Sequence, residues 1–254
     1  MGWHGQHGLL GGSDGGDPCG VHDPTGAVGH PRVAAVGPAH ARQPGDPGLN
    51  VTEEVGVGPH PEPWPDDARL DPELLADGDR RNVVDRYRYW SREAIVADLD
   101  GRRHPFHVAV ENWEHDFNIG TVVRNANAFM AGGVHIVGRR RWNRRGAMVT
   151  DRYQHVTHHP DVVDLMAWAA TADLAVVGID NLPGSVPLES TALPERCVLV
   201  FGQEGPGLSH EVRDAATMVC SIAQYGSTRS INAGVASGIA MHAWIRQHAG
   251  QPPI

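Results

Sequence analysis

The chain has 254 residues, of which 41% are hydrophobic and 20% are charged, and its formal net charge at pH 7 is −9. This length and apolar content suffice for one large or two small domains with a buried core. No apolar run approaches the length of a membrane span, and the N-terminus lacks the pattern of a signal peptide. The three cysteines, Cys19, Cys197 and Cys220, are too widely spaced for a disulfide framework or a zinc site. We therefore expect a cytoplasmic protein that binds neither a membrane nor a metal.

The acidic total is unevenly distributed along the chain. Residues 1–70 hold nine acidic residues and three Arg, whereas residues 80–152 hold 14 Arg and eight acidic residues, a local net charge of +6. All 21 cationic residues are Arg, which coding bias explains most simply. Guanidinium groups nevertheless present forked donors that suit phosphate, so nucleic-acid binding stays open for this region.

The N-terminal part divides into a tail and an extension. Residues 1–65 contain 25 Gly or Pro and show no periodic apolar pattern, so we predict a disordered tail over residues 1–70. In residues 71–104, apolar residues recur at roughly helical spacing with Arg between them, which predicts a basic helical extension. The apolar positions are Val83, Val84, Tyr87, Trp90, Ile95 and Leu99. Its Arg residues fit RNA contact and an ordinary solvated helix face equally well.

Residues 105–250 alternate between predicted strands and helices. Short apolar runs at 106–110, 134–137, 174–179, 197–201 and 218–222 predict buried strands, and residues 119–131, 161–172, 209–216 and 232–248 predict helices. This alternation indicates an α/β fold with a mostly parallel sheet and helices on both faces. A ligand of such a sheet binds beyond the carboxyl ends of the strands. Three polar segments follow predicted strands and are therefore candidates for the site.

The first polar segment runs from residue 118 to residue 129. Asn118 is a candidate N-cap for the helix that follows, and Gly120 is expected to keep its first turn open to a ligand. Arg124 lies among small and apolar neighbours and needs an anionic partner, because burying an Arg alone is costly. That partner is either a ligand or an acidic side chain of the protein.

The second polar segment, residues 199–209, joins a predicted strand to a helix that Ser209 can cap. Gly202 and Gly207 allow the backbone to approach a ligand closely. A dinucleotide site would need a different glycine spacing and an acidic residue at the end of the next strand, at 218–222, and neither is present. A nucleotide-dependent oxidoreductase is therefore disfavoured.

The third polar segment, residues 221–232, connects a strand to the long helix 232–248, which Ser230 or Asn232 can cap. Gly234 and other small residues open this helix. Since Gly is unfavourable inside a helix, they indicate close backbone packing, either within the domain or across a dimer.

Together the three segments resemble the signature motifs of the SpoU (TrmH-like) branch of the SPOUT RNA methyltransferases, and the resemblance covers about residues 106–248. The family pattern reads N-x-G-x-x-x-R-x-A-x-x-F, then G-x-E-x-x-G-L-S, then I-P-x-x-G-x-x-x-S-L-N-V. The matching residues are Asn118, Gly120, Arg124, Ala126, Phe129, Gly202, Glu204, Gly207, Leu208, Ser209, Ile222, Gly226, Ser230 and Asn232. Ala223 stands where the family usually has Pro, and Ile231 where it usually has Leu.

The resemblance implies S-adenosylmethionine as methyl donor, a ribose 2′-hydroxyl of tRNA or rRNA as acceptor, a C-terminal trefoil knot and an obligate homodimer. It assigns cofactor binding to Gly202, Gly207, Ile222, Gly226 and Ile231, and the catalytic surface to Asn118, Arg124, Glu204, Ser230 and Asn232. Arg124 is expected to bind phosphate and stabilise the developing alkoxide, because a guanidinium does not deprotonate at neutral pH. Glu204 either orients Arg124 or Asn232 or caps local backbone.

An arginine-rich loop follows the predicted strand 134–137. Its residues are Arg139, Arg140, Arg141, Trp142, Arg144 and Arg145. Phosphate contacts with stacking on the indole make an RNA-binding loop, and a solvated charge run is the alternative. The histidines at 155, 158 and 159 lie outside the three segments and are expected to be solvated.

The substrate prediction rests on Gln224, Arg229 and Ser230, which together are more typical of relatives that modify a guanosine in the tRNA D-loop than of rRNA enzymes. The rRNA enzymes often carry a separate N-terminal RNA-binding domain, which residues 1–70 do not resemble. We therefore expect guanosine 2′-O-methylation of tRNA. An rRNA ribose methyltransferase is the alternative, and a non-catalytic RNA-binding protein of the same fold is less favoured.

Overall fold

The computed structural model describes residues 56–114, 116, 118–203 and 205–250. Most of the predicted tail lies outside these ranges, but its last part does not. Val57 pairs with Asp79 and Leu70 with Trp90 in antiparallel bridges. Backbone hydrogen bonds to the following segment therefore order residues 56–70, and the prediction of disorder is wrong for them.

The N-terminal extension contains three short helices. These are α1 (Pro72–Asp77), the 3-10 helix η1 (Asp85–Tyr87) and α2 (Arg92–Asp100). Tyr89 has a positive φ of 63°, and Ser91 caps α2 through its side chain, so the helical pattern is interrupted between η1 and α2. All of the predicted apolar positions except the exposed Val84 still meet, because Tyr87 and Ile95 form a small core with Tyr153 on which the others pack.

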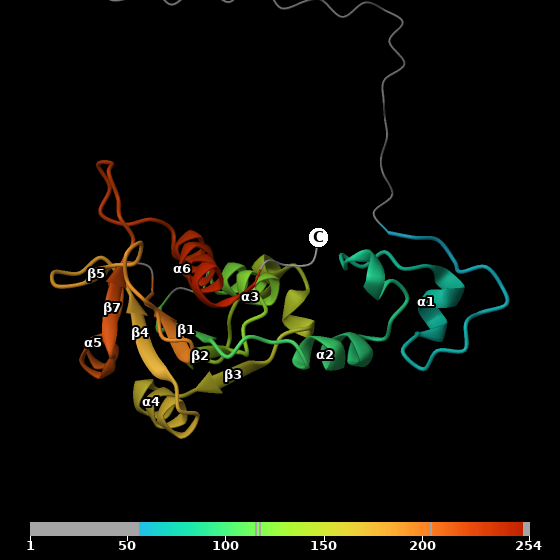
Figure 1. The fold of residues 1–254 in the computed structure, drawn as a ribbon, viewed down its shortest axis with the longest axis horizontal. Helices are drawn as coiled ribbons and strands as arrows, with labels where there is room; N and C mark the ends of the chain where they lie inside the picture. Colours follow the sequence, from blue (N-terminus) through green and yellow to red (C-terminus); the bar gives the residue numbers. More distant parts are fainter. Residues whose placement is uncertain (1–55, 115, 117, 204, 251–254) are drawn as a thin grey trace, which may run out of the picture. The chain divides into compact units, whose positions relative to one another are not determined.

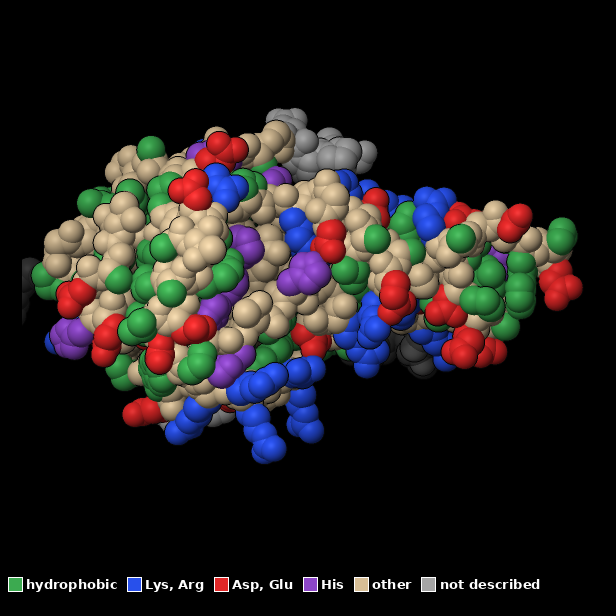
Figure 2. Space-filling model, turned by 90° about the horizontal axis from the view of Figure 1, so that it is seen from below, with side chains coloured by type: hydrophobic (Ala, Val, Ile, Leu, Met, Phe, Trp, Pro, Cys, Tyr) green, Lys and Arg blue, Asp and Glu red, His purple; other side chains and the backbone are tan. Residues whose placement is uncertain are grey.

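The extension is not basic on balance, which corrects the expectation from its Arg pattern. Residues 71–104 hold seven Arg and eight acidic residues. Most of these Arg pair locally: Arg81 with Asp79 at 2.7 Å, for example, and Arg102 with Asp98. In Figure 2, blue and red side chains are interspersed over this segment. Local ion pairs therefore account for most of its arginines, and an RNA contact by this segment remains a hypothesis.

Seven parallel strands form one sheet in the order β3-β2-β1-β6-β4-β7-β5. The strands are β1 (His107–Asn112), β2 (Val134–Gly138), β3 (Val156–His159), β4 (Ala175–Ile179), β5 (Val186–Pro187), β6 (Cys197–Phe201) and β7 (Met218–Ser221). The five strands expected from the sequence are present. The two edge strands β3 and β5 are additional, and the predicted fold class is confirmed. The trefoil knot implied by the family resemblance remains a prediction.

Helices cover both faces of the sheet (Figure 1). On one face lie α3 (Ile119–Ala128) and α6 (Ala233–His248), and on the other lie α4 (Val162–Thr171) and α5 (His210–Ala215). The side chains of β1 alternate accordingly, because Val108 and Val110 join the core under α3 and α6 whereas Ala109 joins the core under α4 and α5. No helix in the described ranges is long and apolar enough to cross a membrane.

The small residues of α6 pack directly against α3. A Cβ added at Gly234 would lie 2.8 Å from the Cγ2 atom of Thr121. Asn125 of α3 donates hydrogen bonds to the carbonyl oxygen of Gly234 and to the hydroxyl of Ser237. Close packing within the domain therefore accounts for the glycine at this position, as one of the two expectations had it.

Three histidines form a buried chain of hydrogen bonds across β1, β2 and β3. His107 Nδ1 lies 3.0 Å from His135 Nε2, and His135 Nδ1 lies 2.8 Å from His159 Nε2. This series of hydrogen bonds ends where His159 Nδ1 meets the carboxylate of Asp164. The Trp168 ring covers His135 at a centroid distance of 3.8 Å. Burial lowers the pKa of His107 to about 4 and that of His135 to about 3. His159 is only 3% exposed, so the expectation that it is solvated is wrong.

Candidate active site

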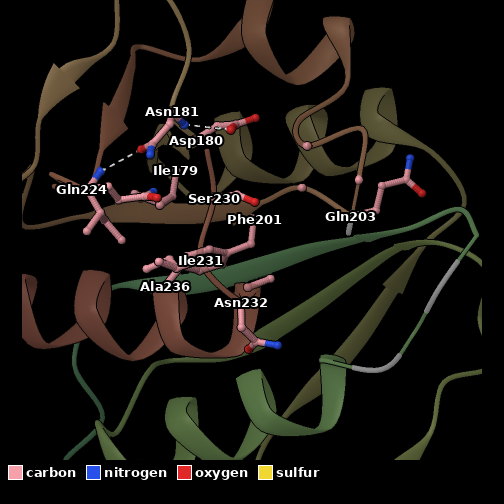
Figure 3. A pocket seen from close by; sticks show the side chains of 15 residues that line it. Ile179, Asp180, Asn181, Phe201, Gln203, Gln224, Ser230, Ile231, Asn232 and Ala236 are labelled. Atoms are coloured by element: carbon pink, nitrogen blue, oxygen red, sulfur yellow. Dashed lines mark hydrogen bonds between the residues drawn. The ribbon is translucent and has the colours of Figure 1, made fainter. Parts of the chain in front are cut away.

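A cavity of about 330 Å³ opens where β4, β6 and β7 end (Figure 3). These strands are neighbours in the sheet, so their carboxyl ends share one edge. The lining residues are Ile179, Asp180, Asn181, Phe201, Gly202, Gln203, Gly205, Gly207, Ile222, Gln224, Ser230, Ile231, Asn232, Ala233 and Ala236. Two of the three polar segments therefore meet in this cavity, as the parallel topology predicts.

The glycine turn after β6 folds back on itself so tightly that Gly202 tolerates no side chain. A Cβ at Gly202 would lie 2.1 Å from the carbonyl carbon of Gly207. Gly207 has a φ of +73°, and its backbone N–H donates to the carbonyl oxygen of Gln203 at 3.1 Å. Ser209 then caps α5 by accepting from the N–H of Val212. This turn presents bare backbone to the cavity.

Asp180 and Asn181, which follow β4, are site residues that the sequence analysis missed. The Asp180 carboxylate accepts from the backbone N–H of Leu208 at 3.0 Å, and the Asn181 side-chain oxygen accepts from the N–H of Ile222 at 3.1 Å. The end of β4 thereby holds the turn after β6 and the loop after β7. The signal was available, because a polar pair directly after a buried parallel strand lies at the ligand-binding edge.

The replacement of the family's usual Pro by Ala223 creates a further contact. Ala223 has a backbone N–H, which donates to Glu189 Oε1 at 2.8 Å. A proline at this position has no N–H to donate. The loop after β7 is thus held from the β5 side by a bond that the usual residue does not form.

The first polar segment joins the site through one hydrogen bond. The Asn232 side-chain amide donates to Asn118 Oδ1 at 2.8 Å, across 114 residues of sequence. Asn232 also caps α6 by accepting from the N–H of Val235. Asn118 occupies the N-cap position of α3, but its side chain makes no capping bond and bonds to Asn232 instead.

Arg124 lies away from the cavity lining. Its side chain is exposed, and it makes no hydrogen bond or ion pair with any described residue. A structural salt bridge within the described chain therefore does not explain it.

Glu204 lies outside the described residues. Gly226 is exposed and does not line the cavity, unlike the other four residues predicted to bind the cofactor. Ser230, which was assigned to the catalytic surface, does line it.

Gly120 has a different role from the one expected. A Cβ at Gly120 would lie 2.7 Å from the Cα atom of Gly146 in the 3-10 helix η2 (Arg144–Ala147). The residue is buried, so it does not leave the first turn of α3 open to a ligand. The glycine instead lets the arginine-rich loop dock directly on the start of α3.

The arginine-rich loop, residues 139–145, is held by a buried amide at the end of β1. Asn112, 1% exposed, donates to the carbonyl oxygens of Arg139 and Arg141 at 2.7 and 3.0 Å. The side chains of Arg140, Arg141 and Arg145 are exposed and pair with no acidic group in the described ranges. Arg144 lies over the Trp142 ring at 5.6 Å. Arg144 also pairs with Asp151 at 3.5 Å, so the backbone of this loop displays three unpaired cations and one paired cation around an aromatic ring. Figure 2 shows a group of Arg side chains projecting together from the sheet-containing part.

The fold and the cavity define a class: a parallel α/β protein with a glycine-lined pocket at the carboxyl ends of its central strands. The family model of the SpoU rRNA Methylase family matches residues 105–242. The chain therefore belongs to the SpoU family, as the three motifs indicate.

Known proteins of this family resemble the chain in sequence and in fold. An uncharacterized tRNA/rRNA methyltransferase from Mycolicibacterium vanbaalenii is 32% identical over 186 residues, which cover 68% of this chain and 58% of the relative. The chain thus spans less than two thirds of that relative's length. The A. aeolicus TrmH/SpoU tRNA modifying enzyme shares the fold with a TM-score of 0.55 and 21% identity, covering 61% of this chain and 81% of that one. An AdoMet-bound rRNA methyltransferase from Sinorhizobium meliloti has a TM-score of 0.52 and 26% identity, covering 59% and 60%.

Proposed function

We propose that the protein is an S-adenosylmethionine-dependent RNA methyltransferase that methylates a ribose 2′-hydroxyl. The observation that carries this proposal is the convergence of the three family motifs. The turn at 202–207 and the loop at 222–232 line one cavity, and the bond between Asn118 and Asn232 ties the start of α3 to that loop. The names of the relatives, which are tRNA/rRNA methyltransferases, support the same activity.

The cavity fits S-adenosylmethionine on two observations. Gln203 and Gln224 are lining residues, and their side-chain Oε1 atoms have no hydrogen-bond partner among the described residues, so a bound ligand could supply the missing donors after a rotation of the amides. Gly202 and Gly207 let the turn close tightly, because a Cβ at Gly202 would meet the Gly207 backbone and one at Gly207 would meet Asp180, and the closed turn lines the cavity with backbone. Gly202, Gly207, Ile222 and Ile231 would hold the cofactor, with Gly226 shaping the loop. The bound cofactor supplies an electrophilic methyl group on sulfur.

The protein's own task is to align a weakly acidic hydroxyl and to stabilise the alkoxide that develops as it attacks. Ser230, Asn118 and Asn232 provide polar groups around the mouth of the cavity. Arg124 binds phosphate and stabilises the alkoxide, and Glu204 orients it or Asn232. Since Arg124 is exposed and lies outside the lining of its own cavity, we infer a homodimer in which it serves the site of the partner subunit.

RNA binding is assigned to the arginine-rich loop. Its exposed guanidinium groups, most of them without an acidic partner among the described residues, provide phosphate contacts, and Trp142 provides a stacking surface for a base or sugar. The loop docks on the start of α3 through Gly146 and Gly120, so it lies beside the helix that carries Arg124. We favour a guanosine of tRNA as the substrate on the strength of Gln224, Arg229 and Ser230.

The proposal is tested by incubating the protein with methyl-labelled S-adenosylmethionine and total RNA from a strain that lacks its gene. Nuclease digestion and mass mapping should locate a 2′-O-methylguanosine in tRNA. Label in an rRNA ribose would confirm the activity and correct the substrate. Absence of label from every RNA, with cofactor bound, would leave only the non-catalytic RNA-binding protein.

Arg124→Ala provides the matched variant. It should retain the fold and cofactor affinity, because its side chain contacts neither the core nor the cavity lining. Turnover should fall at least ~100-fold, as when one stabilising donor is lost from comparable sites. Undiminished turnover would refute the role given to Arg124 while leaving the activity itself intact.

A further inference from the structure

The cavity carries one charged side chain among its described lining residues, and that is Asp180. Its carboxylate lies on the cavity wall next to Asn181 (Figure 3). In the described part of the chain, no Arg or His side chain pairs with it. The proposed cofactor site therefore contains an anion without a protein counter-charge.

Backbone contacts fix this carboxylate in place. Oδ2 accepts from the N–H of Leu208 at 3.0 Å, and Oδ1 accepts from the N–H of Asn181 at 2.8 Å. Gly207 closes against it, since a Cβ there would lie 2.3 Å from Oδ2. The carboxylate cannot swing away without breaking both bonds, so its charge is pre-organised.

Holding the loops does not by itself require a charge. A neutral amide oxygen suffices for such a bond, since Asn181 holds the N–H of Ile222, although the carboxylates of Glu189 and Glu111 hold those of Ala223 and Ser209. The negative charge of Asp180 is therefore additional to its structural role, and its electrostatic effect reaches the cavity.

We propose that Asp180 makes the cavity select the cationic methyl donor over the neutral by-product. This inference rests on the proposed function. S-adenosylmethionine and S-adenosylhomocysteine share the adenosine and the amino-acid group, and they differ by one methyl group and the positive charge on sulfur. A fixed anion on the cavity wall attracts the sulfonium and has no such attraction for the thioether. Even with the screening of water, one such charge pair at contact distance changes relative affinity about fivefold.

The test is isothermal titration calorimetry of both ligands on the wild-type protein, on Asp180→Asn and on Glu189→Gln. The second variant removes a carboxylate that lies near the same loop but outside the cavity lining. The ratio of the two dissociation constants, by-product over donor, should fall at least about fivefold in Asp180→Asn and change less than about twofold in Glu189→Gln. An unchanged ratio in Asp180→Asn would overturn the inference and leave the proposed function standing. If neither ligand binds the wild-type protein, the proposed function fails and the inference with it.

If loss of a hydrogen bond to the backbone unfolds Asp180→Asn, circular dichroism will show it. A measurement on the wild-type protein then tests the inference without this variant. Sinefungin carries an amine in place of the sulfonium methyl group, so it presents a cation at the same position. Both cationic ligands should bind more tightly than S-adenosylhomocysteine. Equal or tighter binding of the thioether than of both cations would overturn the inference.

Discussion

Acidification should destabilise the protein through the buried chain of histidines, between pH 6.5 and pH 5. Burial lowers the pKa of His107 to about 4 and that of His135 to about 3, whereas both are close to 6.5 in an unfolded chain. Below pH 6.5 the unfolded state therefore binds more protons than the folded state. The free energy of unfolding must then fall as the pH falls.

The size of the effect follows from those two pKa values. At pH 5, each histidine costs about 2 kcal/mol of stability relative to pH 7.5, so the pair costs about 2–4 kcal/mol depending on how far the two share one proton. The described carboxylates with lowered pKa, such as Asp79 and Asp98, titrate below this window because their ordinary value is 3.8. The loss between pH 6.5 and pH 5 is thus attributable to histidine.

Urea unfolding followed by circular dichroism at pH 7.5, 6.0 and 5.0 measures this loss. With a slope of about 2 kcal/mol per molar urea, the midpoint should fall by about 1–2 M between pH 7.5 and 5. His135→Gln removes one titrating ring and should reduce the fall by about half. A midpoint independent of pH in the wild-type protein would refute the assignment of buried neutral histidines.

Two further predictions concern the cavity and the arginine-rich loop. Gly202→Ala should abolish S-adenosylmethionine binding in calorimetry and lower the melting temperature, because the new Cβ would lie 2.1 Å from a backbone carbon. Gly58 has open space around it, so the control variant Gly58→Ala should leave the melting temperature unchanged. The double variant Arg140→Gln/Arg141→Gln should reduce the slope of log affinity for RNA against log salt concentration by about 1.5. The control variant Arg86→Gln in the extension should leave this slope unchanged. An unaltered slope in the double variant would show that RNA does not bind at the arginine-rich loop.

The sequence identified the functional edge of the sheet because two simple regularities coincide there. Buried strands are visible as apolar runs, and parallel strands place all their carboxyl ends together. The turn after β6 and the loop after β7 were therefore predicted to lie together, and both line the cavity. The same rule points to Asp180, although its segment matches none of the three motifs.

Other features depend on packing that no local pattern reveals. β3 and β5 are edge strands with several exposed residues, so their apolar periodicity is weak. His159 belongs to a polar stretch of sequence and is buried only because His135 and Asp164 provide partners. Gly120 looked like an opening for a ligand because its real neighbour, Gly146, is distant in sequence. The arginines of the extension, by contrast, have acidic partners within a few residues in the sequence, so a count of both charges over residues 71–104 already excludes a net basic segment.

The backbone contact between Gly120 and Gly146 has a mechanical consequence. Because no side chain separates the two backbones, the arginine-rich loop and the first turn of α3 must shift together. That turn begins beside Asn118, whose bond to Asn232 reaches the rim of the cavity. A displacement of the loop is therefore transmitted to the rim of the cavity, which under the proposed function would couple arrival of the RNA to alignment of the methyl donor.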